Sequence, residues 1–227
     1  MKKKATTKER DIGFARLDYD RERRCGVPEV IFALGKSVDQ IADIMEAMVK
    51  DGRNAWASRV SPEKADAVKF LLPKVKYHEE AQMLTWDVAP LPKRTGLVAV
   101  VCAGTSDVAI AEEAAFTAER LGAKVAREYD VGVAGLHRLL GRIESIRKAR
   151  VIVAVAGMEG ALPSVVGGLV SSPVIGVPAS VGYGVGAGGF AALAGMLSGC
   201  VPGTMVVNID NGFGAGVAAA KINRMHN

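Results

Sequence analysis

A long stretch of the sequence lacks charge, because no Lys, Arg, His, Asp or Glu occurs between Glu159 and Asp210. Glycines and prolines interrupt this stretch, so it holds no clean apolar span of the ~20 residues that a helix needs to cross a bilayer. We therefore predict no membrane segment. The pattern is typical of a buried α/β core that packs on sister subunits and holds a ligand in its turns, because glycine-rich loops approach phosphate closely and helix N-termini attract anions.

Aromatic residues are also few, at 5%, and the net charge of +5 is spread along the chain. A nucleic-acid-binding surface needs clustered Lys and Arg together with aromatic side chains, so we expect no nucleic-acid partner. The N-terminal Met-Lys-Lys-Lys is followed by polar residues rather than by the apolar core of a secretory signal. This start favours a cytoplasmic protein.

Cysteine is scarce, since Cys25, Cys102 and Cys200 are an odd number without metal-ligand spacing. This pattern argues for reduced thiols rather than for disulfides or a zinc site. Cys102 falls inside a predicted strand, where a cysteine is usually an inert small hydrophobe. Cys200 lies in a predicted loop between a glycine and a proline-containing turn, where its thiol could be exposed to a ligand, so it is the candidate nucleophile.

Length and pattern predict two domains, a small N-terminal α/β domain over residues 1–94 and a larger one over residues 95–227, with prolines at the junction. Helix caps and apolar spacing give the elements of the first domain. We expect strands over Val30–Leu34 and 55–60, a helix from the Ser37 cap to Gly52, a helix over Glu63–Leu72 and extended chain between Tyr77 and Trp86.

The second domain shows a regular alternation of strands and helices. Predicted strands cover Leu97–Ala103, Ala123–Arg127, Val151–Ala156, Val174–Val177 and Met205–Asn208, and predicted helices cover Val108–Leu121, Leu136–Lys148, Pro163–Val170, Phe190–Leu197 and Gly212–Arg224. Alternating units with short loops predict a doubly wound, parallel, five-stranded sheet. Ligands of such sheets bind beyond the carboxyl ends of the strands.

Two polar segments follow the first two strands of this sheet. The first is the turn of Gly104, Thr105, Ser106 and Asp107. Ser106 and Asp107 either cap the next helix, or Ser106 binds a phosphate and Asp107 a ribose hydroxyl. The same spacing fits both interpretations, so both stay open. The pair at 137–138, His-Arg, begins a helix after two loop glycines. It is an anion-binding candidate, with a structural histidine and a solvated arginine as the alternative.

Two further segments carry carboxylates. Gly157, Met158 and Glu159 follow the third strand, and a carboxylate that enters an uncharged region must be paired, protonated or exposed in a cleft. Glu159 is therefore a candidate acid–base group, with a carboxylate at a helix N-terminus as the alternative. Asp210 and Asn211 follow the last strand and are either turn formers or ligands for ribose, phosphate or a metal.

The turn at 104–107, the His137-Arg138 pair and Pro173–Pro178 resemble the aminoimidazole ribonucleotide (AIR) carboxylase, or PurE-like, superfamily of purine biosynthesis. The resemblance implies a flavodoxin-like sheet and octamers. In the purine enzyme a second histidine motif of Ala-His-Leu-Pro-Gly type stands where this chain has Met158–Pro163. The purine enzyme also lacks an N-terminal unit and a segment like Ser198–Thr204.

Where the chain departs from the purine enzyme, its sequence resembles the LarB family, the pyridinium-3,5-biscarboxylic acid mononucleotide synthases of nickel-pincer cofactor biosynthesis. The resemblance runs from about Leu17 to the end of the chain. It is carried by Arg21–Glu29, Gly35-Lys36, Gly157–Glu159, Gly182–Gly188, Cys200–Gly203 and Val207–Gly216.

The LarB resemblance implies carboxylation of the pyridinium ring of nicotinic acid adenine dinucleotide and hydrolysis of its phosphoanhydride, which releases AMP. Carbon dioxide or bicarbonate is then the co-substrate, and magnesium is a candidate cofactor. A pyridinium carbon is too electron-poor to attack carbon dioxide, but addition of a thiolate converts the ring to an electron-rich dihydropyridine. Cys200 is the candidate for that covalent step, and Glu159 for removal of the proton after carboxylation.

The remaining roles follow from the same resemblance. Asp210 is the candidate that assists hydrolysis, and the substrate-binding candidates are Gly104, Thr105, Ser106, Asp107, His137, Arg138, Gly157, Met158 and Asn211. Two alternatives stay open: a purine carboxylase or mutase, and a regulator that binds the nucleotide without consuming it. We expect a homo-octamer or homotetramer, because the uncharged segment is too large for one domain to bury.

Overall fold

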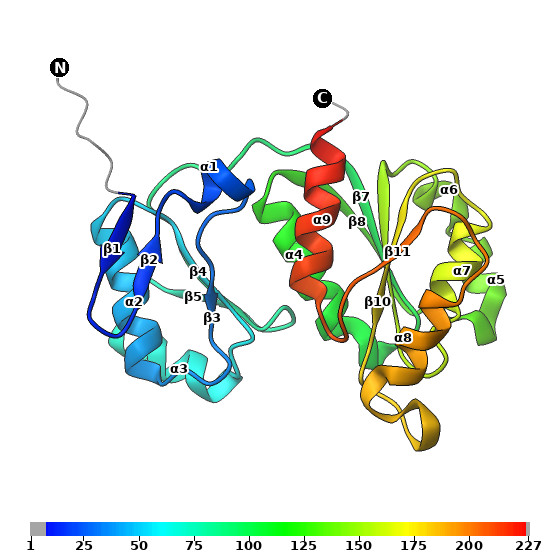
Figure 1. Ribbon diagram of the computed structural model, residues 1–227, viewed down its shortest axis with the longest axis horizontal. Helices are drawn as coiled ribbons and strands as arrows, with labels where there is room; N and C mark the ends of the chain where they lie inside the picture. Colours follow the sequence, from blue (N-terminus) through cyan, green and yellow to red (C-terminus); the bar gives the residue numbers. More distant parts are fainter. Residues whose placement is uncertain (1–7, 226–227) are drawn as a thin grey trace. The chain divides into compact units, whose positions relative to one another are not determined.

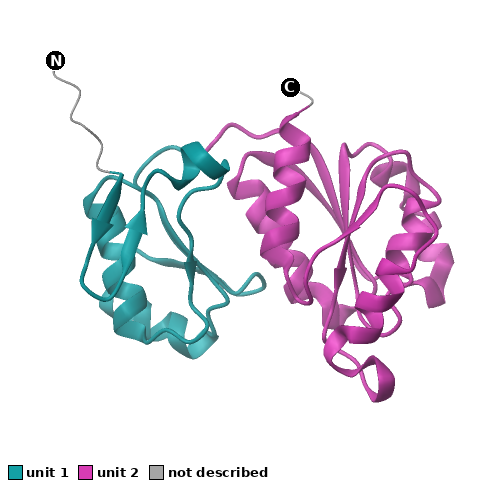
Figure 2. Cartoon of the chain, viewed as in Figure 1, with its two compact units in different colours: residues 1–90 teal, residues 91–227 magenta. Residues whose placement is uncertain are grey.

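The computed structural model describes residues 8–225. The chain divides into two compact units, one that ends at Pro90 and one that starts at Leu91 (Figure 2). The division falls within the proline-containing junction, four residues before the domain boundary that we drew from the sequence. The N-terminal Met-Lys-Lys-Lys lies outside the described residues.

The N-terminal unit contains a two-stranded hairpin and a four-stranded mixed sheet of order β3-β4-β6-β5. In this sheet β3 and β4 are parallel and the other pairs are antiparallel. The strands are β1 (Glu9–Asp11), β2 (Arg16–Asp18), β3 (Ile31–Phe32), β4 (Ala55–Ser58), β5 (Lys76–His78) and β6 (Met83–Trp86), and the helices are α1 (Arg21–Cys25), α2 (Val38–Lys50) and α3 (Pro62–Leu71).

Helix α2 begins as the sequence predicts. The Ser37 hydroxyl accepts from the Gln40 N–H at 3.1 Å, and the Gln40 side chain accepts from the Ser37 N–H at 3.0 Å, which completes a capping box. The strand predicted over Val30–Leu34 is shorter than expected. Its cause is a turn at Gly35, where the Lys36 N–H donates to the Ala33 carbonyl and draws the chain away from the sheet.

The C-terminal unit is built on a five-stranded sheet of order β8-β7-β9-β10-β11, in which every pair is parallel. In chain order this arrangement is 2-1-3-4-5, which is the flavodoxin-like order with its switch point between β7 and β9. The strands are β7 (Thr95–Cys102), β8 (Ala123–Glu128), β9 (Val151–Ala156), β10 (Val174–Pro178) and β11 (Thr204–Val206). The predicted doubly wound parallel sheet is confirmed.

Helices cover both faces of this sheet (Figure 1). On one face α4 (Val108–Arg120) and α9 (Gly212–Arg224) pack against each other and against the strands. The other face carries α5 (Leu136–Leu140), α6 (Ile143–Ile146), α7 (Leu162–Gly167) and α8 (Phe190–Leu197). Short 3-10 turns lie at Thr105–Asp107 (η1), Val133–Gly135 (η2) and Gly184–Gly189 (η3).

Most of the predicted elements of this unit lie where the sequence places them, and β9, α8 and α9 have the predicted bounds. The single helix predicted over Leu136–Lys148 is wrong. Two short helices stand there instead, because α5 ends at Gly141 and Arg142 starts a new turn. Glycine in a helix interior costs about 1 kcal/mol relative to alanine, which favours such a break.

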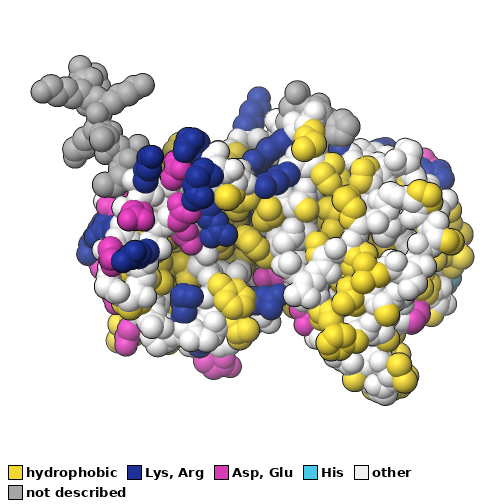
Figure 3. All heavy atoms as spheres, in the orientation of Figure 1, with side chains coloured by type: hydrophobic (Ala, Val, Ile, Leu, Met, Phe, Trp, Pro, Cys, Tyr) yellow, Lys and Arg dark blue, Asp and Glu magenta, His cyan; other side chains and the backbone are white. Residues whose placement is uncertain are grey.

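The uncharged stretch contains only short helices and strands. Within residues 8–225, no helix is both long and apolar enough to cross a bilayer. The stretch is instead divided among α7, β10, η3, α8 and β11. Hydrophobic side chains remain exposed over its η3–α8 segment (Figure 3), where Val185 is 92% and Phe190 is 72% exposed.

Candidate active site

A cavity of about 490 Å³ lies at the carboxyl ends of the strands of the C-terminal unit. Parallel strands end at one edge of the sheet, so the loops that follow β7, β8, β9 and β10 meet there. The lining comes from Ala103, Gly104, Ser106, Asp107, Asp130, Gly132, Val133, Ala134, Arg138, Ala156, Gly157, Met158, Glu159, Ala161, Leu162, Val181, Gly182 and Tyr183. Seven of the predicted site residues therefore share one cavity.

The turn after β7 supplies the first wall. The carboxylate of Asp107 accepts from the Gly104 N–H at 2.9 Å, and this contact closes the turn. Asp107 is only 5% exposed, and burial raises the pKa of its carboxyl. Ser106 is exposed and lines the cavity. Asp107 thus closes the turn through Gly104 and makes no side-chain cap hydrogen bond to α4, so the capping alternative is wrong for this residue. It also borders the space where a ligand would lie.

The loop after β8 supplies a charged wall. Arg138 is the first arginine of α5, and its Nη1 lies 2.5 Å from the Asp130 carboxylate. Both side chains line the cavity. His137 precedes Arg138 by one residue, but it is exposed and does not belong to the described lining. Successive residues of a helix point about 100° apart, so the cavity receives one side chain of this pair.

The turn after β9 brings Glu159 to the cavity. Met158 adopts a left-handed conformation with φ 54°, and the Gly160 N–H donates to the Gly157 carbonyl at 3.0 Å. A Cβ atom at Gly157 would lie 2.4 Å from the Val181 carbonyl oxygen, so only glycine allows this turn to meet the loop after β10. The Glu159 side chain is exposed in the cavity, which is the cleft placement that the sequence left open.

The loop after β10 is held in place by Asp210, which follows β11. The Ser180 N–H donates to the Asp210 carboxylate at 2.7 Å, and the Asp210 N–H donates to the Pro178 carbonyl at 2.8 Å. Asn211 caps α9 by accepting from the Gly214 N–H at 2.8 Å. Asp210 and Asn211 stand outside the described lining, so the structure gives both a role in shaping the backbone.

Cys200 lies in the loop between α8 and β11, at the amino end of its strand, whereas the cavity lies at the carboxyl ends. Its thiol is exposed, but among the residues that the structure describes it does not line the cavity. Thr105 is also exposed outside the lining. Within one chain, Cys200 thus precedes its strand whereas Glu159 follows its strand, and only Glu159 lines the cavity.

Cys102 has the character that the sequence predicts. It is fully buried at the end of β7, and burial raises the pKa of its thiol to about 11. A thiol with so high a pKa is almost entirely protonated at neutral pH and is a poor nucleophile.

A metal cage is not evident in residues 8–225, which contain no group of three or more His, Cys, Asp or Glu side chains placed to hold an ion. Magnesium is commonly held by one or two carboxylates together with the phosphates of a substrate. The carboxylates that line the cavity could therefore supply part of the coordination of a magnesium ion whose other ligands are substrate phosphates.

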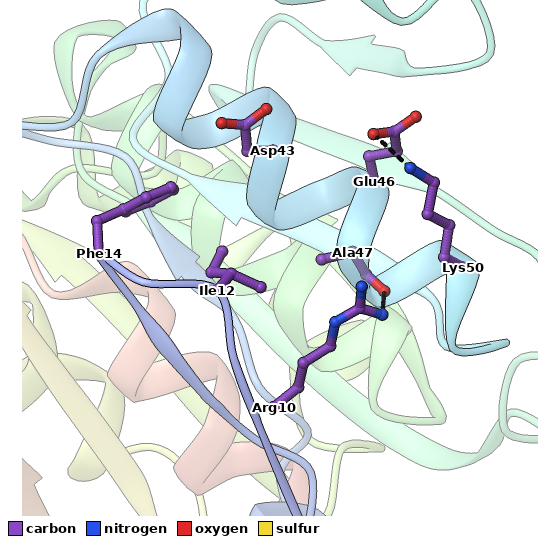
Figure 4. Close-up of a pocket in the computed structure, with 7 residues that line it drawn as sticks. All are labelled: Arg10, Ile12, Phe14, Asp43, Glu46, Ala47 and Lys50. Carbon is purple, nitrogen blue, oxygen red and sulfur yellow. Dashed lines mark hydrogen bonds and ion pairs between the residues drawn. The ribbon is translucent and has the colours of Figure 1, made fainter.

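The N-terminal unit has a smaller hollow of about 220 Å³ between its hairpin and α2 (Figure 4). Its cations are engaged by the protein, since Arg10 pairs with Asp51 at 2.6 Å and Lys50 with Glu46 at 2.9 Å. Arg10 also donates to the Ala47 carbonyl at 3.3 Å. The cations of this hollow are therefore engaged in contacts within the N-terminal unit.

Sequence reasoning missed two parts of the lining. Asp130 was treated only as a loop residue, although it lies two residues after the end of β8, in a turn like those of the other candidates. The segment 181–183 received no role, although Gly182 was noted for its resemblance and follows the end of β10. Position after a parallel strand was the signal that could have found both.

Comparison with known proteins identifies the domains. Residues 9–88 match the family described as the LarB/PurE-like N-terminal domain, and residues 97–227 match the family described as AIR carboxylase. An uncharacterized protein of Methanocaldococcus jannaschii is 42% identical over 219 residues, which cover 91% of this chain and 83% of that protein.

Two further proteins are similar to part of the chain. The N5-carboxyaminoimidazole ribonucleotide mutase of Methanocaldococcus jannaschii is 36% identical over 85 residues, which cover 36% of this chain and 52% of that enzyme. A crystal structure of a Treponema denticola PurE2 variant shares 21% identity with a TM-score of 0.48, over 58% of this chain and 81% of that chain.

Proposed function

The chain belongs to the LarB family, with an AIR carboxylase domain after its N-terminal domain, and from this premise we propose that it carboxylates the pyridinium ring of nicotinic acid adenine dinucleotide and hydrolyses its phosphoanhydride. The domain families support a carboxylase-type activity related to PurE. The products of the proposed reaction are pyridinium-3,5-biscarboxylic acid mononucleotide and AMP, and carbon dioxide or bicarbonate is the co-substrate.

Glu159 is the observation that carries the choice of substrate. At this position the purine enzyme has a histidine motif, whereas here a carboxylate enters the cavity beside Ser106 and Arg138. A carboxylate is a suitable base for a carbon-bound proton made acidic by an adjacent cationic ring. It is poorly suited to protonate or deprotonate a neutral imidazole in the way that a histidine does.

The proposed steps balance without an oxidant or reductant. A thiolate forms a C–S bond to a ring carbon, and the displaced π electron pair moves onto the ring nitrogen, which gives a neutral dihydropyridine. The nitrogen lone pair then drives a neighbouring ring carbon to form a C–C bond to carbon dioxide, which leaves a cationic iminium ring. Glu159 removes the proton from that carbon, and the C–S bond breaks as the ring becomes aromatic again, which returns the thiolate.

Cys200 is the proposed source of the thiolate, and it must then come from another copy of the chain. Within one chain it lies at the opposite edge of the sheet from Glu159. Exposed apolar side chains on the same uncharged stretch, such as Tyr183, Phe190 and Leu197, favour association of copies. A homo-oligomer of four or eight copies would provide such a shared site.

The cavity offers groups for the rest of the dinucleotide. The Arg138 guanidinium would bind a phosphate or the ring carboxylate, and Ser106 with the backbone of the 104–107 turn would bind a ribose or phosphate. Magnesium bound to the phosphates would withdraw charge from the phosphoanhydride. Asp210 would act through the Ser180 loop that it holds.

Incubation of the purified protein with nicotinic acid adenine dinucleotide, bicarbonate and magnesium tests the proposal, with products identified by mass spectrometry. AMP and the dicarboxylated mononucleotide should form together, and Glu159→Gln should form neither at a comparable rate. A protein that instead converts a carboxylated aminoimidazole ribonucleotide, and leaves the dinucleotide intact, would be a purine enzyme.

A further inference from the structure

The backbone around Asp130 is arranged to direct its carboxylate. Asp130 has φ 56°, a left-handed conformation that Asp and Asn adopt more readily than other non-glycine residues. The next residue, Val131, donates its N–H to the Cys102 carbonyl at 3.0 Å, which fastens this loop to the end of β7. The backbone of the segment that carries the Asp130 carboxylate is therefore held next to the end of β7.

Arg138 is restrained on two sides. Its Nη1 lies 2.5 Å from the Asp130 carboxylate. On the other side, a Cβ atom at Gly135 would lie 2.6 Å from Arg138 Nε and 2.9 Å from Nη2, so the guanidinium occupies space that an alanine at position 135 would force it to leave. Arginine has many rotamers, and holding it in one of them makes each later hydrogen bond less costly in entropy.

This ion pair contributes little to the fold. Its side chains are 40% and 53% exposed, and pairs so exposed to water add little to stability. A second pair in the same segment, Arg142 with Glu128 at 3.1 Å, joins a buried carboxylate to an exposed arginine and lies outside the described lining of the cavity. The two pairs differ in the burial of the carboxylate and in their place, because only Asp130–Arg138 borders the cavity.

We infer that Asp130 and Gly135 are positioning residues that hold the Arg138 guanidinium ready for an acidic group of the ligand. The inference rests on the proposed function in so far as the cavity is the nucleotide site. A guanidinium has five N–H donors, and the contact with Asp130 uses one of its two terminal nitrogens. The other nitrogens keep N–H donors that can bind a phosphate or carboxylate of the ligand.

Four variants separate orientation from charge and from stability. Asp130→Asn keeps an oxygen acceptor and a residue suited to φ 56°, whereas Asp130→Ala removes the acceptor. Gly135→Ala pushes the guanidinium away without changing any charge. Arg142→Ala is the matched control, because it removes an ion pair of the same segment away from the cavity.

Isothermal titration calorimetry measures the affinity of each variant for nicotinic acid adenine dinucleotide, without bicarbonate, and for aminoimidazole ribonucleotide. For whichever nucleotide binds the wild type, Asp130→Ala and Gly135→Ala should bind about tenfold more weakly, and Asp130→Asn and Arg142→Ala within about threefold of the wild type. Retained affinity in Asp130→Ala or Gly135→Ala, or a loss in Asp130→Asn as large as in Asp130→Ala, would overturn the inference.

The outcome is independent of turnover. If the wild type binds the dinucleotide but forms no dicarboxylated product, the proposed function is contradicted. The affinities of the variants still test whether Asp130 and Gly135 position Arg138. Variants that bind as the wild type does, in a protein that carboxylates the dinucleotide, contradict the positioning inference alone. A loss in Arg142→Ala equal to that in Asp130→Ala would also contradict it, because the effect would then be one of stability.

Discussion

The Asp107 carboxyl shows how burial at the cavity affects stability. Burial raises its pKa above the ordinary value of 3.8, so the folded state binds this proton more tightly than the unfolded state does. Wherever the folded state holds more protons, the free energy of unfolding falls as pH rises. The contribution of Asp107 is therefore most favourable below pH 3.8 and decreases as pH rises through its folded pKa.

The variant Asp107→Asn removes this pH dependence and keeps an acceptor for the Gly104 N–H. As pH rises from about 3.5 to about 7, the variant should become more stable relative to the wild type, which means that its free energy of unfolding minus that of the wild type increases. Urea denaturation at both pH values measures the difference. A relative stability that moves the other way would show that the charged form of Asp107 is favoured in the folded protein.

Glu159 is the residue whose loss should affect chemistry without affecting binding. It is exposed in the cavity and holds no contact on which the described fold depends, so Glu159→Gln should fold normally. Removal of a general base lowers rates by about 10²–10⁴-fold, so kcat should fall by that factor while KM changes little. Steady-state kinetics of product formation measures both, and an unchanged kcat would remove Glu159 from the proton transfer.

At the scale of elements, the loop after β10 depends on Asp210. Loss of an acceptor that leaves a part-buried N–H unsatisfied costs about 1–3 kcal/mol, and here that group is the Ser180 N–H. Asp210→Ala should therefore lower the free energy of unfolding and also weaken nucleotide binding, because the same loop carries Tyr183 into the cavity. Denaturant unfolding and calorimetry measure the two effects.

Asn211→Ala is the matched control for that variant. It removes the N-cap of α9, which costs about 1 kcal/mol, but it leaves the Ser180 contact intact. Its nucleotide affinity should match that of the wild type. Equal affinity losses in both variants would mean that general destabilisation, and not the loop, governs binding.

The sequence predicted the elements of the C-terminal sheet because continuous apolar runs such as Val151–Ala156 are typical of buried parallel strands. It failed where local breaks compete with helical spacing, as at Gly141, which divides the predicted helix over Leu136–Lys148. It also grouped Cys200 with residues at the carboxyl ends of strands. A loop that precedes a parallel strand lies at the other edge, and that placement depends on topology rather than on local pattern.

The predicted cavity residues divide for a similar reason. Residues directly after a strand, such as Asp107 and Glu159, reach the cavity because the strand ends fix their position. For adjacent helical residues, spacing did not reveal which one would face inward, and the cavity receives Arg138 rather than His137. Asp130 was missed because only the glycines and the His-Arg pair of its segment were considered, although its place after β8 pointed to the cavity.

At the scale of the whole molecule, the proposed mechanism needs more than one copy of the chain. If Glu159 and Cys200 of different copies form each site, Glu159→Gln and Cys200→Ala subunits should complement each other. Random mixing in equal amounts would leave about a quarter of the sites with both wild-type residues in a symmetric oligomer. Co-expression with two affinity tags, followed by kinetics of the mixed oligomer, measures this recovery.

The two variants alone provide the controls, because each should be inactive by itself. Mixed oligomers with no activity above that of the separate variants would place Glu159 and Cys200 in the same copy or exclude one of them from the reaction. A fully active Cys200→Ala homo-oligomer would remove the thiolate step.

Incorporation of ¹³C-labelled bicarbonate tests the central claim most directly. The protein would receive nicotinic acid adenine dinucleotide or aminoimidazole ribonucleotide in parallel reactions, and mass spectrometry would locate the label. We predict the label in a carboxyl group of a pyridinium mononucleotide that accumulates with AMP. Label in the imidazole product alone, or in neither product, would contradict the assignment of this chain as a pyridinium carboxylase.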